Sequence, residues 1–287
     1  MTTGVVRVDG RDLEVLTAGS GRVTVVLEAG LTASAAAWLP IIPRLAPVAR
    51  VLAVSRAGYG RSTPRRAGAA QGSVDDLVAV LDQRGETGPL VLVGHSWGGP
   101  LCRLLAAQQP SRVVALVLVD ATHEGFAGMR RRGATALGLL GMTLGLVKAH
   151  TGLTRRELNA SKGAAAELLA RLPEPARVRL VDEFARPATW RQARRDFPAV
   201  KRLLLQLQRE PLAPPEVPVV GVIGGKGEGR AGKLRAVVRA AYEPWLASMP
   251  DGRLVVAPNS GHLVPFEDED LLVKVIEELV IEVEASR

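Results

Sequence analysis

Ser96 is the residue whose surroundings most clearly indicate chemistry. It lies at the centre of segment 94–98, Gly-His-Ser-Trp-Gly, in which the two glycines leave room for a tight turn with the serine oxygen exposed. Four apolar residues, 90–93, precede this segment and indicate a buried strand, and the pattern of 100–109 is typical of a helix with proline in its first turn. We interpret the segment as a strand-to-helix turn that presents a nucleophile. The alternative is a glycine-rich turn with a capping serine.

A serine at its ordinary pKa is a poor nucleophile, so Ser96 needs a histidine to take its proton and a carboxylate to orient that histidine. His262 follows the last expected strand in the polar segment 258–267, where open α/β sheets place their sites. The side chain of His95 should point away from its neighbour Ser96, and His150 has no supporting motif. We therefore expect His262 to be the base.

Three carboxylates are candidates for the orienting acid. Asp120 ends the very apolar run 113–119 and would reach the same sheet edge as the serine and the histidine. Glu228 is the carboxylate in the glycine-rich segment that follows the run 217–223, and Glu124 is a third candidate. Because a strand end holds a side chain more rigidly than a glycine-flanked loop does, we favour Asp120 and keep Glu228 as the alternative.

The elements that must position these residues alternate between β-branched runs and helical patterns. This alternation predicts an α/β fold with a mostly parallel, eight-stranded sheet and helices on both faces. Strands are expected at residues 5–8, 13–17, 23–28, 51–54, 90–93, 113–119, 217–223 and 254–257. Helices of the core are expected at residues 38–45, 73–84, 100–109, 233–248 and 267–284.

Residues 123–215 interrupt this alternation, because they show helical patterns and no convincing strand. We expect a helical cap there, inserted after the sixth strand, and an α/β core made of residues 1–122 and 216–287. Within the cap, the apolar run 134–147 indicates a helix that covers a pocket. A helix at a membrane surface is the less favoured interpretation, because the run lacks a strongly polar face and is too short to span a bilayer.

The net charge of +8 arises within the cap region, where residues 121–215 hold 17 Lys and Arg against 8 Asp and Glu. With 3% aromatic residues and no nucleic-acid motif, a nucleic-acid partner is not expected.

Cys102 is the single cysteine, which excludes an internal disulfide and suggests a buried thiol. The first residues lack a signal-peptide pattern, so we expect a cytoplasmic enzyme.

From residue 23 to about 280 the chain resembles the α/β-hydrolase-fold serine hydrolases, in particular capped members of the esterase and lipase type. The resemblance lies in four motifs: Glu-Ala-Gly-Leu at 28–31, Arg-Ala-Gly-Tyr-Gly-Arg-Ser at 56–62, the serine turn at 94–98, and Gly-His at 261–262. The order nucleophile, acid, histidine is also that of the family. Ser55 departs from the family, since many relatives have an aspartate there, and we expect only a local effect.

The resemblance implies that a Ser-His-Asp triad cleaves a carboxylic ester of a small-molecule acyl substrate through an acyl-serine intermediate, with no cofactor and no metal. It also implies that backbone N–H groups of Leu31 and Trp97 hold the oxyanion. Ala29 replaces the histidine that usually precedes the glycine of this loop, and the backbone donor is retained. A serine at position 96 disfavours epoxide hydrolase and dehalogenase chemistry, which uses an aspartate there.

Two kinds of alternative remain open. The same triad supports amidases, thioesterases, C–C hydrolases, perhydrolases and acyltransferases, and a fold alone does not separate them. A ligand-binding protein with a hydrolase-like pocket and little turnover is a different class. The missing aspartate after the seventh strand is the feature that favours this second class.

Overall fold

A computed structural model describes residues 1–65, 70–126, 133–160, 164–227 and 229–286. Eight strands form one sheet in the order β1-β2-β4-β3-β5-β6-β7-β8. The strands are β1 (Thr2–Val8), β2 (Arg11–Ala18), β3 (Thr24–Glu28), β4 (Arg50–Val54), β5 (Leu90–His95), β6 (Val113–Val119), β7 (Val219–Gly224) and β8 (Gly252–Ala257). All eight expected strands are confirmed, and so is the fold class.

The sheet is mostly parallel. The pairs β1–β2 and β2–β4 are antiparallel, and the remaining neighbours are parallel. Strands β3, β5, β6 and β7 are buried along their whole length, as their continuous Val, Leu and Ile runs predict for strands covered on both faces. Because these strands are parallel, their carboxyl ends meet at one edge of the sheet.

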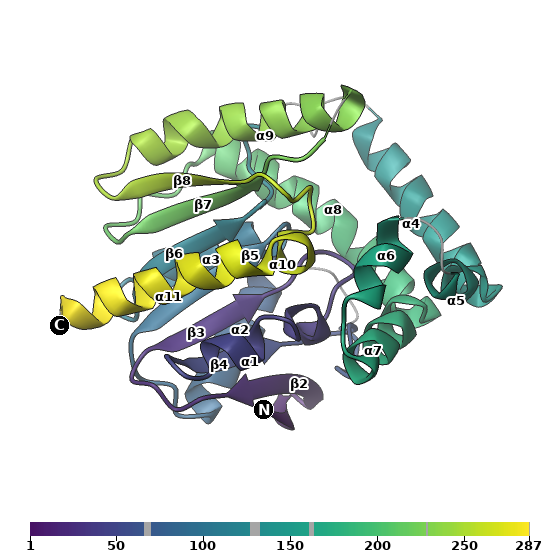
Figure 1. The fold of residues 1–287 in the computed structure, drawn as a ribbon, viewed down its shortest axis with the longest axis horizontal. Coiled ribbons are helices and arrows are strands. Elements are labelled where there is room, and N and C mark those ends of the chain that lie inside the picture. Colours follow the sequence, from purple (N-terminus) through teal and green to yellow (C-terminus); the bar gives the residue numbers. More distant parts are fainter. Residues whose placement is uncertain (66–69, 127–132, 161–163, 228, 287) are drawn as a thin grey trace.

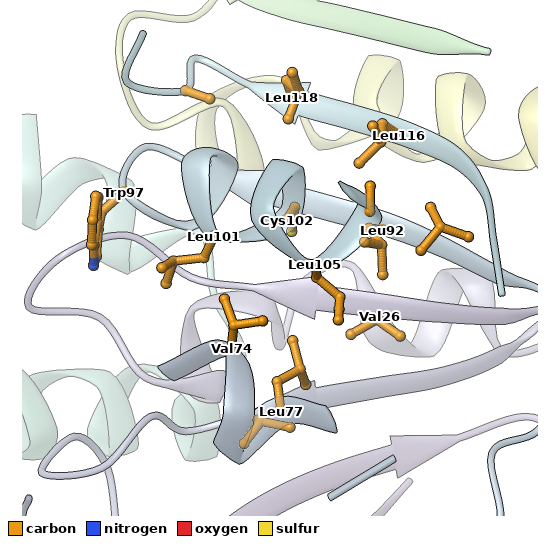
Figure 2. Close-up of a cluster of buried hydrophobic side chains, with 14 of the residues drawn as sticks. Val26, Val74, Leu77, Leu92, Trp97, Leu101, Cys102, Leu105, Leu116 and Leu118 are labelled. Atoms are coloured by element: carbon orange, nitrogen blue, oxygen red, sulfur yellow. The ribbon is translucent and has the colours of Figure 1, made fainter. Parts of the chain in front are cut away.

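Helices cover both faces of the sheet (Figure 1). One face is covered by α2 (Ala70–Gln83), α3 (Gly98–Gln108) and α9 (Gly229–Ala247), and the other by α1 (Ile42–Leu45) and α11 (Glu269–Ala285). Figure 2 shows how α3 fills the first layer: Leu101, Cys102 and Leu105 lie between strand residues such as Leu92 and the α2 residue Val74. This layer holds α3, and with it the turn that precedes α3, rigidly against the sheet.

The core helices differ from expectation in several of their bounds. The helix expected at 38–45 is divided into a short 3-10 helix, Ala35–Trp38, and α1, because Pro40 between them removes a backbone donor. Helix α2 begins at Ala70 instead of residue 73. Its Asp76 accepts bonds of 2.6 and 2.7 Å from Arg11 on β2, so this carboxylate ties the helix to the sheet.

Five helices and no strand occupy the described residues between β6 and β7. They are α4 (Ala134–His150), α5 (Leu153–Asn159), α6 (Ala164–Ala170), α7 (Glu174–Phe184) and α8 (Pro187–Arg209). We refer to them as the cap helices. Figure 1 shows α4 to α7 gathered at one end of the sheet, opposite the C-terminus of the chain.

Helix α4 packs along α8, and two of its glycines allow the close approach. A Cβ on Gly138 would overlap the ring of Phe197, and a Cβ on Gly145 would overlap the ring of Trp190. The opposite face of α4 is exposed and apolar, with Leu137, Leu140, Leu144 and Val147 between 54% and 71% accessible. The apolar run therefore marks a helix that is buried on one side only.

Within the described residues, each helix by itself is too short or too polar to cross a bilayer. Only α4 and α5 taken together, with an 83° bend between them, reach the required length and apolar composition.

The glycines of α4 give a matched test of its contact with α8. Gly145→Ala should lower the free energy of unfolding, because the new methyl group meets the half-buried ring of Trp190. Gly141→Ala should instead raise the free energy of unfolding by about 0.5–1 kcal/mol, because a Cβ added at this position would have no atom within 4 Å and alanine favours the helix. Urea unfolding followed by circular dichroism measures both. Equal effects of the two substitutions would contradict this arrangement of α4.

Candidate active site

Ser96 adopts a left-handed backbone, with φ of +53°, in the turn between β5 and α3. A non-glycine residue rarely holds this conformation unless the surrounding structure enforces it. Here a Cβ on Gly98 would overlap the backbone of Glu28, and a Cβ on Gly94 would lie 2.7 Å from the backbone of Gly98. The two glycines therefore let three backbone segments meet at the serine, as the sequence predicts for such a turn.

Ser96, His262 and Asp120 are aligned by two hydrogen bonds. Asp120 Oδ2 accepts from His262 Nδ1 at 2.5 Å, and His262 Nε2 lies 3.1 Å from Ser96 Oγ. Because Nδ1 carries the proton given to the carboxylate, Nε2 is free to accept the serine proton. The strand ends β5 and β6 and the loop after β8 thus bring the three expected residues together in the order that general-base catalysis needs.

Asp120 is buried, with 3% of its surface accessible, and its backbone is also left-handed, with φ of +39°. Its Oδ1 accepts from the backbone N–H of Gly224 at 3.2 Å, and Arg235 of α9 forms an ion pair with the same Oδ2 that His262 binds. Burial opposes ionisation of Asp120, but the bond from His262 and the charge of Arg235 outweigh it and lower the pKa of the carboxyl. The carboxylate is therefore ionised at neutral pH.

The other two acid candidates lie elsewhere or outside the description. Glu124 accepts bonds of 2.6 and 2.8 Å from Arg103, so both oxygens of its carboxylate are bound to that guanidinium. Glu228 lies outside the described residues. Of the histidines, His150 is exposed on α4, and His123 is buried against Tyr242 with its pKa lowered by burial to about 4.

His95 takes part in the site in a way that the sequence reasoning missed. Its Nε2 donates to the backbone carbonyl of His262 at 2.8 Å, and the centres of the two rings are 4.8 Å apart. Burial and the neighbouring His262 lower the pKa of His95 to about 4, so the ring is neutral near pH 7. His95 thus holds the loop that carries the expected base. The signal available was a polar side chain at the end of an otherwise apolar strand.

Leu31 and Trp97 line a common cavity with Ser96. Leu31 lies in the loop after β3, and Trp97 directly precedes α3 (Figure 2). Among the described residues, neither backbone N–H donates to a protein acceptor. Two free donors beside a serine oxygen match what an oxyanion needs.

Two cavities meet at the serine, and both are lined by Leu31, Ser96 and His262. We call the larger one chamber A; it has a volume of about 310 Å³ and is walled mainly by apolar side chains of α5, α6 and α7 such as Leu158, Leu169 and Phe184. Chamber B has a volume of about 250 Å³. Its further lining is Trp97, Asp120, Ala121, Thr122, His123, Phe126, Phe197, Val200, Val238 and Ala241.

No residue of α4 lines either chamber. The interpretation of the run 134–147 as a helix that covers the pocket is therefore wrong, because α5 to α8 provide that cover and α4 packs on the outer side of α8.

As for metals, the described residues contain no group of three or more His, Cys, Asp or Glu side chains that could bind an ion.

His95 provides a test through the pH dependence of stability. Because its pKa of about 4 in the folded chain lies below the ordinary value of 6.5, the unfolded chain binds a proton first as the pH falls. The free energy of unfolding therefore decreases as the pH falls from 6.5 to 4, and this histidine contributes up to roughly 3 kcal/mol to the decrease. His95→Gln keeps a donor for the carbonyl of His262 and should reduce that loss when urea unfolding is measured across this range. Parallel curves for variant and wild type would rule out a buried neutral His95.

Comparison with known proteins agrees with this architecture. Two solved structures superpose over nearly the whole chain: Cfl2 from Burkholderia cenocepacia, with a TM-score of 0.75, 22% identity and coverage of 96% of this chain and 94% of that one, and the Cif epoxide hydrolase from Acinetobacter nosocomialis, with a TM-score of 0.77, 16% identity and coverage of 97% and 88%. At these identities the likeness establishes the fold.

Sequence comparison identifies the family. Lipase LipV of Mycobacterium tuberculosis is 39% identical over 116 residues, which are 38% of this chain and 41% of that protein. The chain thus matches about two fifths of the length of this curated relative. A model of the Alpha/beta hydrolase family matches residues 25–275, which is most of the chain. The chain belongs to the Alpha/beta hydrolase family.

Proposed function

We propose that this hydrolase-family member is a serine hydrolase that cleaves a carboxylic ester of a small-molecule acyl substrate through an acyl-serine intermediate. The observation that carries the proposal is the alignment of Asp120, His262 and Ser96 by contacts of 2.5 and 3.1 Å beside two free backbone donors. A lipase among the relatives supports an ester substrate.

The reaction begins when Ser96 Oγ attacks the ester carbonyl and gives its proton to His262 Nε2. The carbonyl electron pair moves to its oxygen, where the N–H groups of Leu31 and Trp97 stabilise the negative charge. Asp120 stabilises the imidazolium. Collapse of the intermediate expels the alkoxide, which takes the proton from Nε2. Water, deprotonated by His262, then attacks the acyl-serine, and collapse of the second tetrahedral intermediate releases the carboxylic acid while His262 returns the proton to Ser96 Oγ.

The two chambers support an ester with an apolar group on each side of the scissile carbonyl. Both chambers reach Ser96, and most of their lining is apolar. An apolar cavity of about 150 Å³ accommodates benzene, so each chamber has room for on the order of ten non-hydrogen atoms. This favours medium-sized apolar esters over long-chain fats and over charged substrates.

Other chemistry on the same residues has less support. Cleavage of an amide, a thioester or a C–C bond can use the same triad residues. The assay below therefore includes an amide and a thioester. Although a Cif epoxide hydrolase shares the fold, Ser96 stands where that chemistry uses an aspartate. The missing aspartate after β7 is the argument for a binding protein without turnover. This argument is weaker than in the sequence alone, because Asp120 accepts a hydrogen bond from His262.

Ser96→Ala should lower kcat for p-nitrophenyl esters by about 10⁴-fold or more and abolish labelling by a fluorophosphonate, because both require the serine oxygen. Asp120→Asn should cost about 10³- to 10⁴-fold, since the neutral amide no longer stabilises the imidazolium. Steady-state kinetics with matched ester, thioester and amide substrates measures these effects.

Glu228→Gln is the matched control for the acid and should leave kcat within about twofold of the wild type. Loss of activity in this variant together with a normal rate for Asp120→Asn would reassign the acid. A wild type that neither turns over nor becomes labelled would favour the binding protein.

Chamber B can be narrowed by a substitution that leaves Ser96, Asp120 and His262 unchanged. Ala241→Phe places a ring in this chamber, and the exposed neighbour Ala240→Phe is its control. Two series of esters are compared, one lengthened on the acyl side and one on the alcohol side. For the long members of one of these series, kcat/KM of Ala241→Phe should fall about tenfold or more, because each excluded methylene costs about 1–3 kcal/mol. Methyl acetate should be hydrolysed at the wild-type rate. Equal losses for every ester would argue against a chamber that holds one side of the substrate.

A further inference from the structure

Arg56 is a buried cation that the proposed reaction does not use. It lies two residues after the end of β4, and 6% of its surface is accessible. Its Nη1 contacts the carboxylate of Glu28 and the backbone carbonyl of Ala29, and its Nη2 donates to the carbonyl of Gly30 at 2.5 Å. A buried ion pair of this kind contributes little net stability, because desolvation offsets the attraction between the charges. Its placement on two successive carbonyls therefore calls for another explanation.

The carbonyl of Gly30 and the N–H of Leu31 belong to one peptide group. This group is planar, and the described chain contains no cis peptide bond, so the C=O and N–H bonds point in opposite directions. By holding the Gly30 oxygen, Arg56 directs the Leu31 N–H away from itself. Arg56 lines neither chamber, whereas Leu31 lines both.

The same peptide group lies next to the nucleophile. A Cβ on Gly30 would be 3.1 Å from the Cβ of Ser96, so the loop after β3 passes directly beside the serine. A small rotation of this peptide group would therefore move the Leu31 N–H relative to any oxyanion formed on Ser96.

The loop needs external support to keep its conformation. Thr32 is β-branched and has φ of +66°, a backbone conformation that costs about 1–3 kcal/mol for such a residue. Within the loop, the carbonyl of Gly30 accepts from Ala33 N–H at 3.3 Å, and Thr32 Oγ1 donates to the carbonyl of Leu31 at 2.5 Å. The guanidinium adds a cationic donor from outside the loop, and its planar fork matches two adjacent carbonyls.

We propose that Arg56 is a positioning residue that orients and polarises the peptide group between Gly30 and Leu31, so that the N–H of Leu31 becomes a directed, strengthened donor to the oxyanion. A cation bound to a carbonyl oxygen withdraws electron density from the peptide and strengthens its N–H as a donor. Glu28 supplies the counter-charge that allows the guanidinium to be buried. This inference rests on the proposed function, since it assumes an oxyanion on the substrate.

Arg56→Lys keeps the charge but loses the planar fork, so it cannot hold both carbonyls as arginine does. With an ester substrate, kcat should fall about 10- to 100-fold while KM stays within threefold, because the lost interaction is made only with the oxyanion. Arg61→Met is the control. It removes another cation from the same loop, and the side chain of Arg61 is 66% exposed. This control should retain the wild-type kcat.

A trifluoromethyl ketone separates this role from a merely structural one. Ser96 Oγ adds to its carbonyl carbon, the serine proton passes to His262, and the carbonyl electron pair becomes an oxyanion. Affinity of Arg56→Lys for this ketone should fall by the same factor as kcat/KM, whereas affinity for the matching methyl ketone, which stays planar, should remain within threefold. An equal loss for both ketones, or no loss for either, would overturn the proposal.

The wild type gives an independent measurement that does not require a folded variant. Forming the trifluoromethyl ketone adduct should shift the NMR signals of the Arg56 guanidinium N–H groups, because the charge on the oxyanion is relayed through the Gly30–Leu31 peptide. Arg103 is the internal reference, since it is equally buried but bound to Glu124. Unchanged Arg56 signals in a fully formed adduct would refute the coupling. If no adduct forms and no ester is cleaved, the proposed function itself has failed.

Discussion

The left-handed backbone of Ser96 is a constraint that the rest of the site depends on. A serine can hold this conformation only if neighbouring segments approach its turn closely, and here the turn is bonded to the end of β6 through Ser96 N–H and the carbonyl of Val119, at 3.1 Å. The turn also lies against the end of β3 through Gly98. The segments that carry Leu31 and Asp120 are thereby fixed to the turn of Ser96 by backbone contacts, and side chains add only the final alignment.

The cap helices are joined to this core by polar contacts at loops. Glu183 of α7 accepts from Ser34, which lies in the loop after β3, and Arg179 lies 2.8 Å from the buried Glu14 of β2. Glu14 also accepts from Ser55 at 2.9 Å, so a carboxylate from β2 stands near the place where many relatives have an aspartate. Position 55 is thus linked through Glu14 to Arg179 of the cap helix α7.

The sequence predicted the fold well, because long Val, Leu and Ile runs and alternating helical patterns depend on local periodicity. Ser96, Asp120 and His262 were recognisable because each lies at a strand end or in a glycine-containing turn. The contacts of Arg235 with Asp120 and of Arg56 with the Gly30 carbonyl were not, since each joins elements far apart in the chain. For α4, apolar residues indicated burial, but no local pattern specified that α8 and not the pocket would be its neighbour.

Cys102 has a practical consequence for following the cap in solution. It is the single cysteine of the chain, it is completely buried within α3, and burial raises the pKa of its thiol well above the ordinary value. A thiol in this environment reacts slowly with maleimide dyes. A pair of fluorophores can therefore be attached at engineered cysteines, one on an exposed position of the cap and one on the core, without first removing a native thiol. The distance between cap and core then becomes measurable by energy transfer during turnover.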